Sequence, residues 1–107
     1  MRKTPGQWTI TIDRMAEAGA KPATNANAAG LTGPGTATMT PAEILADPRS
    51  LKFRMRDDGG TLYYEGACYL PEGLTEDAFA PLDDFGEPNA GATAIEYENL
   101  EGVWETL

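Results

Sequence analysis

Carboxylates are the side chains of this sequence with the most capacity for chemistry. They occur as neighbours at positions 57–58, 76–77 and 83–84. Two carboxylates held at a fixed separation act as general acid and base in glycosidases, which makes such pairs the candidates for catalysis. Turns and helix starts also favour adjacent acids, however, and a domain of 107 residues offers little room for a substrate cleft. We therefore expect no enzymatic activity and assign no catalytic residue.

Other reactive groups are scarce. Histidine is absent, and cysteine occurs once, at Cys68, so the usual general base and a structural zinc site are both excluded. No Lys or Arg neighbours Cys68 to lower its pKa, which predicts a packing role in a strand. The oxygen-rich segment 83–89 does not fit EF-hand spacing, and it reads either as an irregular calcium site or as a helix cap followed by a turn. No cofactor or metal is predicted.

Charge divides the chain in two. Residues 1–56 contain all eight bases and four acids, whereas residues 57–107 contain thirteen acids and no base. The net charge of −9 therefore arises in the second half, which should repel nucleic acid and attract basic surfaces. One interpretation is a solubilising surface. The other is a surface that binds a basic partner.

A nucleic-acid mimic is the sharper form of the second interpretation. Carboxylates at i and i+2 of a strand lie about 6.6 Å apart, whereas duplex DNA carries a charge about every 1.7 Å, so several elements must contribute to one surface. The candidate partner-binding residues are Glu72, Glu76, Asp77, Asp83, Asp84, Glu87, Glu96, Glu98 and Glu101.

Three bases alternate at Lys52, Arg54 and Arg56, beside Tyr63 and Tyr69 of the following segment. This arrangement superficially resembles a platform for single-stranded nucleic acid. Three bases are too few for a strong electrostatic footprint, and the acids downstream oppose phosphate. We expect the three bases to pair with acids across a sheet.

The first half of the chain supplies few elements. Residues 7–13 alternate large apolar and polar side chains, as a half-buried strand does. Residues 15–39 contain one large aliphatic side chain, Leu31, and predict a long flexible loop that is functional or that separates the first strand from the rest. Thr40, Pro41 and Glu43 form a capping box with proline at the first helical position, which predicts a short helix over 41–46.

The strongest structural signal is a β-hairpin. Residues 51–56 and 61–65 alternate around a turn at 57–60, and the second strand should run to Leu70 with a bulge or bend at Gly66. If Asp58 and Gly59 form a two-residue turn, the position numbers of two residues that face each other across the hairpin add up to 117. Met55 then faces Leu62, and the other predicted pairs are 53 with 64, 54 with 63 and 52 with 65.

A short helix and a second hairpin complete the chain. A short helix is predicted to begin at Thr75 and to end at Gly86, with Phe79, Leu82 and Phe85 on one face. A turn at 89–91 follows it. Residues 93–98 and 103–107 form the hairpin, with no register fixed for it. The whole is a single domain, 1–107, with a hairpin–helix–hairpin core over 50–107. Its predicted class is α+β, a mainly antiparallel sheet of about five strands with two short helices.

Residues 53–66 and 79–86, together with the final hairpin, resemble small proteins encoded by bacteriophages and mobile elements of high-GC bacteria. The likeness covers about residues 50–107 and carries no activity with it. It implies a class that includes anti-CRISPR and anti-restriction inhibitors, which act on host defence complexes. The expected function is therefore a non-enzymatic acidic inhibitor that occupies a basic, nucleic-acid-binding surface in the host cytoplasm. An accessory or structural phage protein that mediates assembly is the alternative.

No long apolar run for a membrane span is present, and the first residues lack the apolar segment of a signal peptide. The expected location is the cytoplasm. The expected partner is a protein, with no membrane and no direct contact to nucleic acid.

Overall fold

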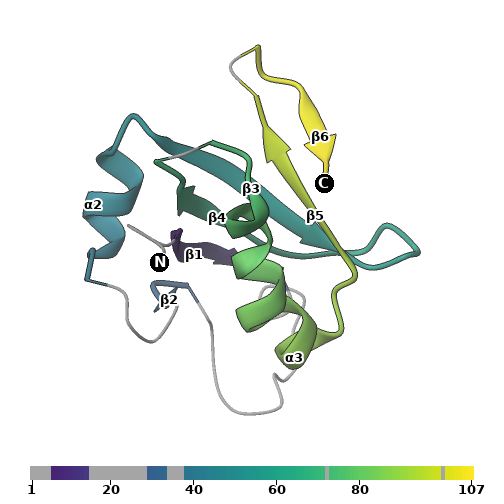
Figure 1. The fold of residues 1–107 in the computed structure, drawn as a ribbon. Helices are drawn as coiled ribbons and strands as arrows, with labels where there is room; N and C mark the ends of the chain where they lie inside the picture. The colour runs from purple at the N-terminus through teal and green to yellow at the C-terminus, as the bar shows by residue number, and fades with distance from the viewer. Residues whose placement is uncertain (1–5, 15–28, 34–37, 72, 100) are drawn as a thin grey trace.

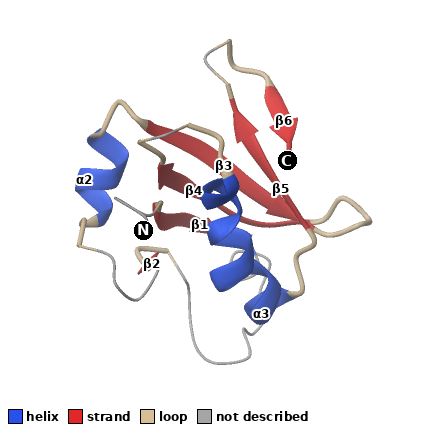
Figure 2. Cartoon of the chain, in the orientation of Figure 1, coloured by secondary structure: helices blue, strands red, loops and turns tan. Residues whose placement is uncertain are grey.

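The computed structural model describes residues 6–14, 29–33, 38–71, 73–99 and 101–107. They form one six-stranded antiparallel sheet in the order β2-β1-β4-β3-β5-β6, with helical segments beside it (Figure 2). The strands are β1 (Gln7–Asp13), β2 (Thr32–Gly33), β3 (Ser50–Arg56), β4 (Leu62–Tyr69), β5 (Ala94–Glu98) and β6 (Trp104–Thr106). The predicted α+β class is confirmed, with one strand more than expected.

Strand β1 matches its predicted bounds and lies inside the sheet, between β2 and β4. The expectation of an unbroken loop over 15–39 is wrong for residues 32 and 33, which pair with Thr9 and Trp8 as β2. Ile10 extends this pairing, because its N–H donates to Leu31 O and its carbonyl accepts from Gly30 N. The first strand is therefore joined to the rest of the sheet. Residues 15–28 and 34–37 of the predicted loop lie outside the described residues.

Helix α2 (Pro41–Ala46) forms as its capping box predicts. The Thr40 hydroxyl accepts from Glu43 N at 3.2 Å, and the Glu43 carboxylate accepts from Thr40 N at 2.8 Å. Ile44 is fully buried against Ala67 and Tyr69 of β4. This packing holds a six-residue helix that would not be stable alone.

The β3–β4 hairpin is confirmed, but the predicted register is wrong by two residues. Met55 pairs with Tyr64 and Arg54 with Glu65, so facing positions sum to 119 in place of 117. The turn is longer than two residues because the Asp57 carboxylate accepts from Thr61 N at 2.9 Å and Gly60 N donates to Asp57 O. A shift of two leaves every β3 side chain on its predicted face.

Gly66 lies where three chain segments meet. A Cβ at this position would lie 2.0 Å from Thr9 O and 2.7 Å from Phe53 Cζ, so only glycine lets β1 approach β4 here. The expected irregularity at Gly66 occurs on the neighbouring strand. The β1–β4 register shifts between Ile10 and Ile12, while β4 itself runs without interruption.

The helical layer, residues 76–90, is longer than the predicted helix. It consists of a 3₁₀ helix η1 (Glu76–Phe79), a π-helical turn η2 (Leu82–Gly86) and a short helix α3 (Glu87–Ala90). Gly86 does not end it, and the turn expected at 89–91 is wrong, because the left-handed residue that closes the layer is Gly91 at φ +73°. Phe79 does not share a buried face with Leu82, since Phe79 is exposed and Leu82 is buried.

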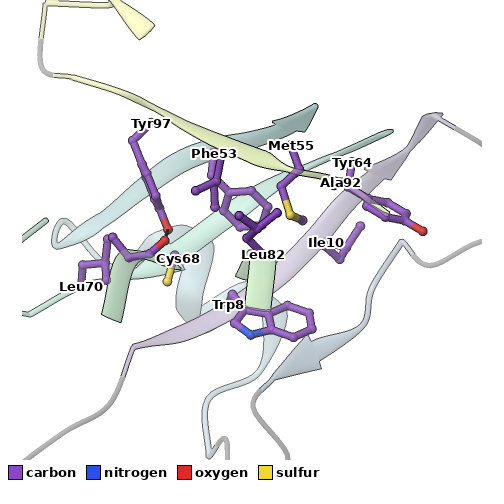
Figure 3. Close-up of a cluster of buried hydrophobic side chains, with 12 residues drawn as sticks. Trp8, Ile10, Phe53, Met55, Tyr64, Cys68, Leu70, Leu82, Ala92 and Tyr97 are labelled. Carbon is purple, nitrogen blue, oxygen red and sulfur yellow. Dashed lines mark hydrogen bonds between the residues drawn. The ribbon is translucent and has the colours of Figure 1, made fainter. Parts of the chain in front are cut away.

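The helical layer covers one face of the sheet, here called the core face (Figure 1). Ala78 and Leu82 belong to the core cluster there, with side chains of four strands. Figure 3 shows Leu82 among Trp8, Phe53 and Tyr97. The Tyr97 hydroxyl donates to Ala78 O at 2.8 Å, which ties η1 to β5. Burial raises the pKa of this phenol far above its usual value, so it stays protonated and keeps donating.

The opposite side of the sheet is here called the open face, and α2 covers one end of it. Lys52, Arg54 and Arg56 of β3 point to this face, because they alternate with the buried Phe53 and Met55. In the last hairpin Glu98 pairs with Trp104. Trp104 therefore lies on the open face, with Arg54 and on the opposite face from Tyr97.

We expect Gly66→Ala to lower the free energy of unfolding by about 3 kcal/mol, because the added methyl group meets the Thr9 carbonyl oxygen at 2.0 Å. Gly59→Ala is the matched control, since a Cβ there lies no closer than 3.4 Å to another group. Urea denaturation of both variants measures the difference. Equal stability of the two variants would show that β1 does not approach β4 as described.

Candidate functional site

The helical layer carries five of the nine predicted partner-binding acids. Glu76 and Asp77 begin η1, where the Thr75 hydroxyl caps the helix by accepting from Asp77 N. The remaining three acids, Asp83, Asp84 and Glu87, are exposed on η2 and at the start of α3. Acids in the first turn of each segment face the positive end of its peptide dipoles. Local helix chemistry thus explains why acids gather here.

Asp84 fastens the layer to the sheet. The indole Nε1 of Trp8 donates to Asp84 Oδ2 at 3.2 Å, and the Trp8 ring lies 5.5 Å from that of Phe85. Trp8 is buried, so this bond satisfies an indole N–H that would otherwise lack a partner. Asp84 has a structural contact, and Asp83 beside it is presented to solvent.

Asp83 and Glu87 make no ion pair and no side-chain hydrogen bond within the described residues. Residues 57–107 contain no Lys or Arg, so no base follows them along the chain. No described base compensates either carboxylate. They are the acids of the helical layer best placed to meet an external cation.

Glu96 has the opposite situation, on the open face. Its Oε1 accepts from Arg56 Nε at 2.8 Å and also from Arg54 Nε, so two guanidinium groups share one carboxylate. The hydrogen bond from Arg56, followed by that from Arg54, holds the pKa of Glu96 below its usual range. The Arg54 guanidinium also lies 4.1 Å from the centre of the Trp104 ring. Glu96 is therefore neutralised within the fold.

Two further acids are neutralised in the same way. Arg14 pairs with Glu65, and Arg49 pairs with Asp47 at 3.1 Å, which lowers the pKa of Asp47. The expectation that bases pair with acids across the sheet is confirmed for Arg54 and Arg56.

Lys52, by contrast, forms no ion pair with any described residue. It borders a groove of about 360 Å³ on the open face, between Leu45 of α2 and Trp104 of β6.

The nine predicted acids do not share one surface. Glu96 and Glu98 lie on the open face, across the sheet from the helical layer. Glu101 is exposed in the turn between β5 and β6, where its N–H donates to Asn99 Oδ1. Glu72 lies outside the described residues. The acids of the helical layer are thus the candidate binding surface, and Glu96 does not belong to it.

Two acids of the β3–β4 turn were missing from the predicted set. Asp57 is occupied internally, because it accepts from Thr61 N and from the Tyr63 hydroxyl, and the Thr61 bond lowers its pKa. Asp58 accepts from Thr93 Oγ1 at 2.7 Å, which fastens the turn to the segment just after α3. This contact spans 35 residues, so no local sequence pattern indicates that Asp58 lies near the end of the helical layer.

Cys68 is fully buried in β4, and burial raises the pKa of its thiol to about 12. A thiol with this pKa stays protonated near neutral pH, which removes it as a nucleophile. The expected packing role of Cys68 fits this environment.

Comparisons with protein-family models, curated proteins and solved structures return no match to this chain. Among the described residues, no three acidic or cysteine side chains gather so that they could hold a metal ion. None of the described helices is long and apolar enough to cross a membrane.

We expect Glu96→Gln to lower the free energy of unfolding at pH 7 by about 1 kcal/mol, because a charge-assisted bond to two arginines is lost on a partly exposed face. Glu101→Gln, in the exposed turn, should leave stability unchanged.

The same variant changes the dependence of stability on pH. The folded pKa of Glu96 is depressed, so its contribution is complete above the unfolded pKa of about 4.3 and is lost as the pH falls through the folded value. The difference between the native chain and Glu96→Gln should then disappear at low pH. Urea unfolding at pH 7, 5, 4 and 3 measures it. A difference that is constant over this range would contradict the pairing.

Proposed function

We propose that the chain is a non-enzymatic binding protein whose helical layer contacts a basic surface on a partner protein. One observation carries this proposal. Asp83 and Glu87 are exposed and unpaired within the described residues, whereas Glu65 and Glu96 on the open face each have an arginine partner. The fold thus leaves Asp83 and Glu87 uncompensated on the helical layer and neutralises Glu65 and Glu96 on the open face.

Such a surface acts first on the rate of association. Complementary charges steer a partner into contact, and the effect weakens as salt shortens the Debye length to about 8 Å at physiological ionic strength. Each exposed ion pair contributes only about 0.2–1 kcal/mol. Several carboxylates must therefore act together, which the spacing of acids along the helical layer permits.

The finer form of the proposal is an inhibitor of the anti-CRISPR or anti-restriction type, encoded by a phage and acting in the host cytoplasm. Two arguments support it: the resemblance of residues 50–107 to small phage and mobile-element proteins, and the acidic layer itself. A protein surface that binds nucleic acid is basic, and an acidic layer that occupies it excludes the nucleic acid by competition.

An accessory or structural phage protein is the second candidate. The observation in its favour is the short edge strand β6, flanked by the exposed side chains of Val103 and Leu107. Exposed strand edges pair with other chains, and a second copy is the simplest partner. This candidate predicts self-association, which light scattering of the purified chain measures.

The proposed surface predicts that charge reversal in the helical layer weakens partner binding. The native chain, immobilised, is used to recover and identify the partner from host extract, and the purified partner is then titrated. Asp83→Lys and Glu87→Lys should each raise the dissociation constant about two- to fivefold, and together about tenfold, more at low salt than at high salt. Glu101→Lys is the charge-matched control and should have little effect. Nucleic acid should compete with the native chain for the partner.

Three results would contradict this proposal. They are recovery of capsid or tail components only, an equal effect of Glu101→Lys and Asp83→Lys, and simultaneous binding of nucleic acid and the chain to the partner. A stable oligomer of the purified chain in light scattering would favour the structural candidate.

A further inference from the structure

A hollow of about 310 Å³ opens between the C-terminal hairpin and the segment that follows β4. Its apolar lining is formed by four residues: Leu51 of β3, Leu70 and Leu74 of the segment that follows β4, and Tyr97 of β5. Leu70 and Tyr97 are buried members of the core, while Leu74 is 47% exposed. The hollow is thus a place where the core reaches the surface beside an exposed leucine. Figure 1 shows the hairpin of β5 and β6 projecting from the body of the sheet.

A carboxylate lines this hollow as well. Glu105 comes from β6 and lies on the same face of the sheet as Tyr97, and Asn99 Nδ2 holds its carboxylate by donating to Oε2 at 3.0 Å. This bond fixes the position of one negative charge at the rim. An occupant of the hollow meets this acid on its hairpin side.

The single base in the lining, Arg49, does not cancel this charge. Its guanidinium is bonded to Asp47 through two nitrogens, each at 3.1 Å, and lies 4.9 Å from the centre of the Tyr69 ring. Hydrogen bonding to Asp47 raises the pKa of Arg49, in keeping with a matched pair. The net charge around the apolar floor is negative.

We propose that this hollow takes one apolar side chain, such as leucine or methionine, from a partner segment that carries lysine or arginine next to it. The volume lies near the lower end of the range for ligand pockets, which suits a side chain better than a larger ligand. An apolar anchor with a flanking base matches both the leucine floor and the Glu105 carboxylate. An acidic neighbour would instead face Glu105 with like charge.

The inference deepens the proposed function and rests on it for the basic character of the partner. Leu74 directly precedes Thr75, the cap of η1, so the hollow adjoins the start of the helical layer. The helical layer and the hollow have different roles in binding. Acids of the layer steer the partner, and the apolar contact, which salt does not screen, determines how long it stays.

The test uses the full chain, ¹⁵N-labelled, and three capped peptides of sequence GKLKG, GKSKG and GELEG. GKLKG should produce saturable chemical-shift changes at the amides of Leu74, Tyr97 and Glu105. GKSKG lacks the anchor and GELEG has the wrong charge, so both should bind at least about tenfold more weakly.

Variants of the hairpin test the carboxylate contribution. Glu105→Gln should raise the dissociation constant for GKLKG about two- to fivefold. Glu101→Gln, the matched control in the turn of the same hairpin, should leave that constant unchanged. Glu105→Lys should reverse the preference, so that GELEG binds more tightly than GKLKG. Leu74→Ser should abolish saturable binding of GKLKG. Leu74 is exposed, and the Glu105 variants keep the test valid if this substitution impairs folding.

Equal binding of GKLKG and GKSKG, or no saturable binding of GKLKG, would overturn the inference. Shifts confined to residues 83–87 would also overturn it while leaving the proposed function intact. GKLKG could instead bind at Leu74 while Asp83→Lys and Glu87→Lys leave the affinity for the partner unchanged. In that case the proposed function fails and the apolar site stands.

Discussion

Strand β3 sets the constraint on which the rest of the structure depends, because its alternation divides the sheet into two chemically different faces. Phe53 and Met55 are fully buried beneath the helical layer, so Arg54 and Arg56 must point the other way. Both arginines lie in the partly buried middle of the sheet, where a cation needs a partner. β5 supplies it, since Glu96 lies directly opposite Arg54 and accepts from both guanidinium groups. Burial on one face therefore determines the electrostatics of the other.

The pairing at Glu96 changes what the acidity of the chain means. The second half carries thirteen acids and no base, yet arginines of the first half neutralise Glu65 and Glu96 within the sheet. On the helical layer Asp83 and Glu87 remain for a partner, with Asp58 beside the segment after α3, and Glu105 remains at the hollow of the last hairpin. The pairing also stabilises the fold, because Arg54 and Arg56 without Glu96 would lie side by side with like charge. The neutralised Glu96 and the uncompensated Asp83 and Glu87 thus lie on opposite sides of the sheet.

Local chemistry explains which parts of this arrangement the sequence predicts. The capping box at Thr40 and the alternation along 7–13 and 51–56 involve neighbours in the chain, and all three elements form within a residue of their predicted bounds. The failures are contacts between distant residues. The β3–β4 register depends on Asp57 closing a longer turn, and β2 forms because Gly33 packs flat on the Trp8 ring, where a Cβ would lie 2.2 Å from Cζ2. The acids predicted as one site fall on both sides of the sheet. The sequence shows that Glu96 is charged, but its place beside Arg54 depends on strand pairing across 42 residues.

The central claim is that Asp83 and Glu87 of the helical layer are available to a partner, whereas Glu65 and Glu96 of the open face are not. Chemical-shift mapping with hexalysine at low ionic strength tests it most directly, because a flexible polycation reports available carboxylates without a preferred shape. The account predicts that hexalysine shifts the amides of residues 76–87 in a salt-dependent manner and leaves those of Glu65 and Glu96 in place. Shifts centred on Glu65 and Glu96, with the helical layer unchanged, would contradict it.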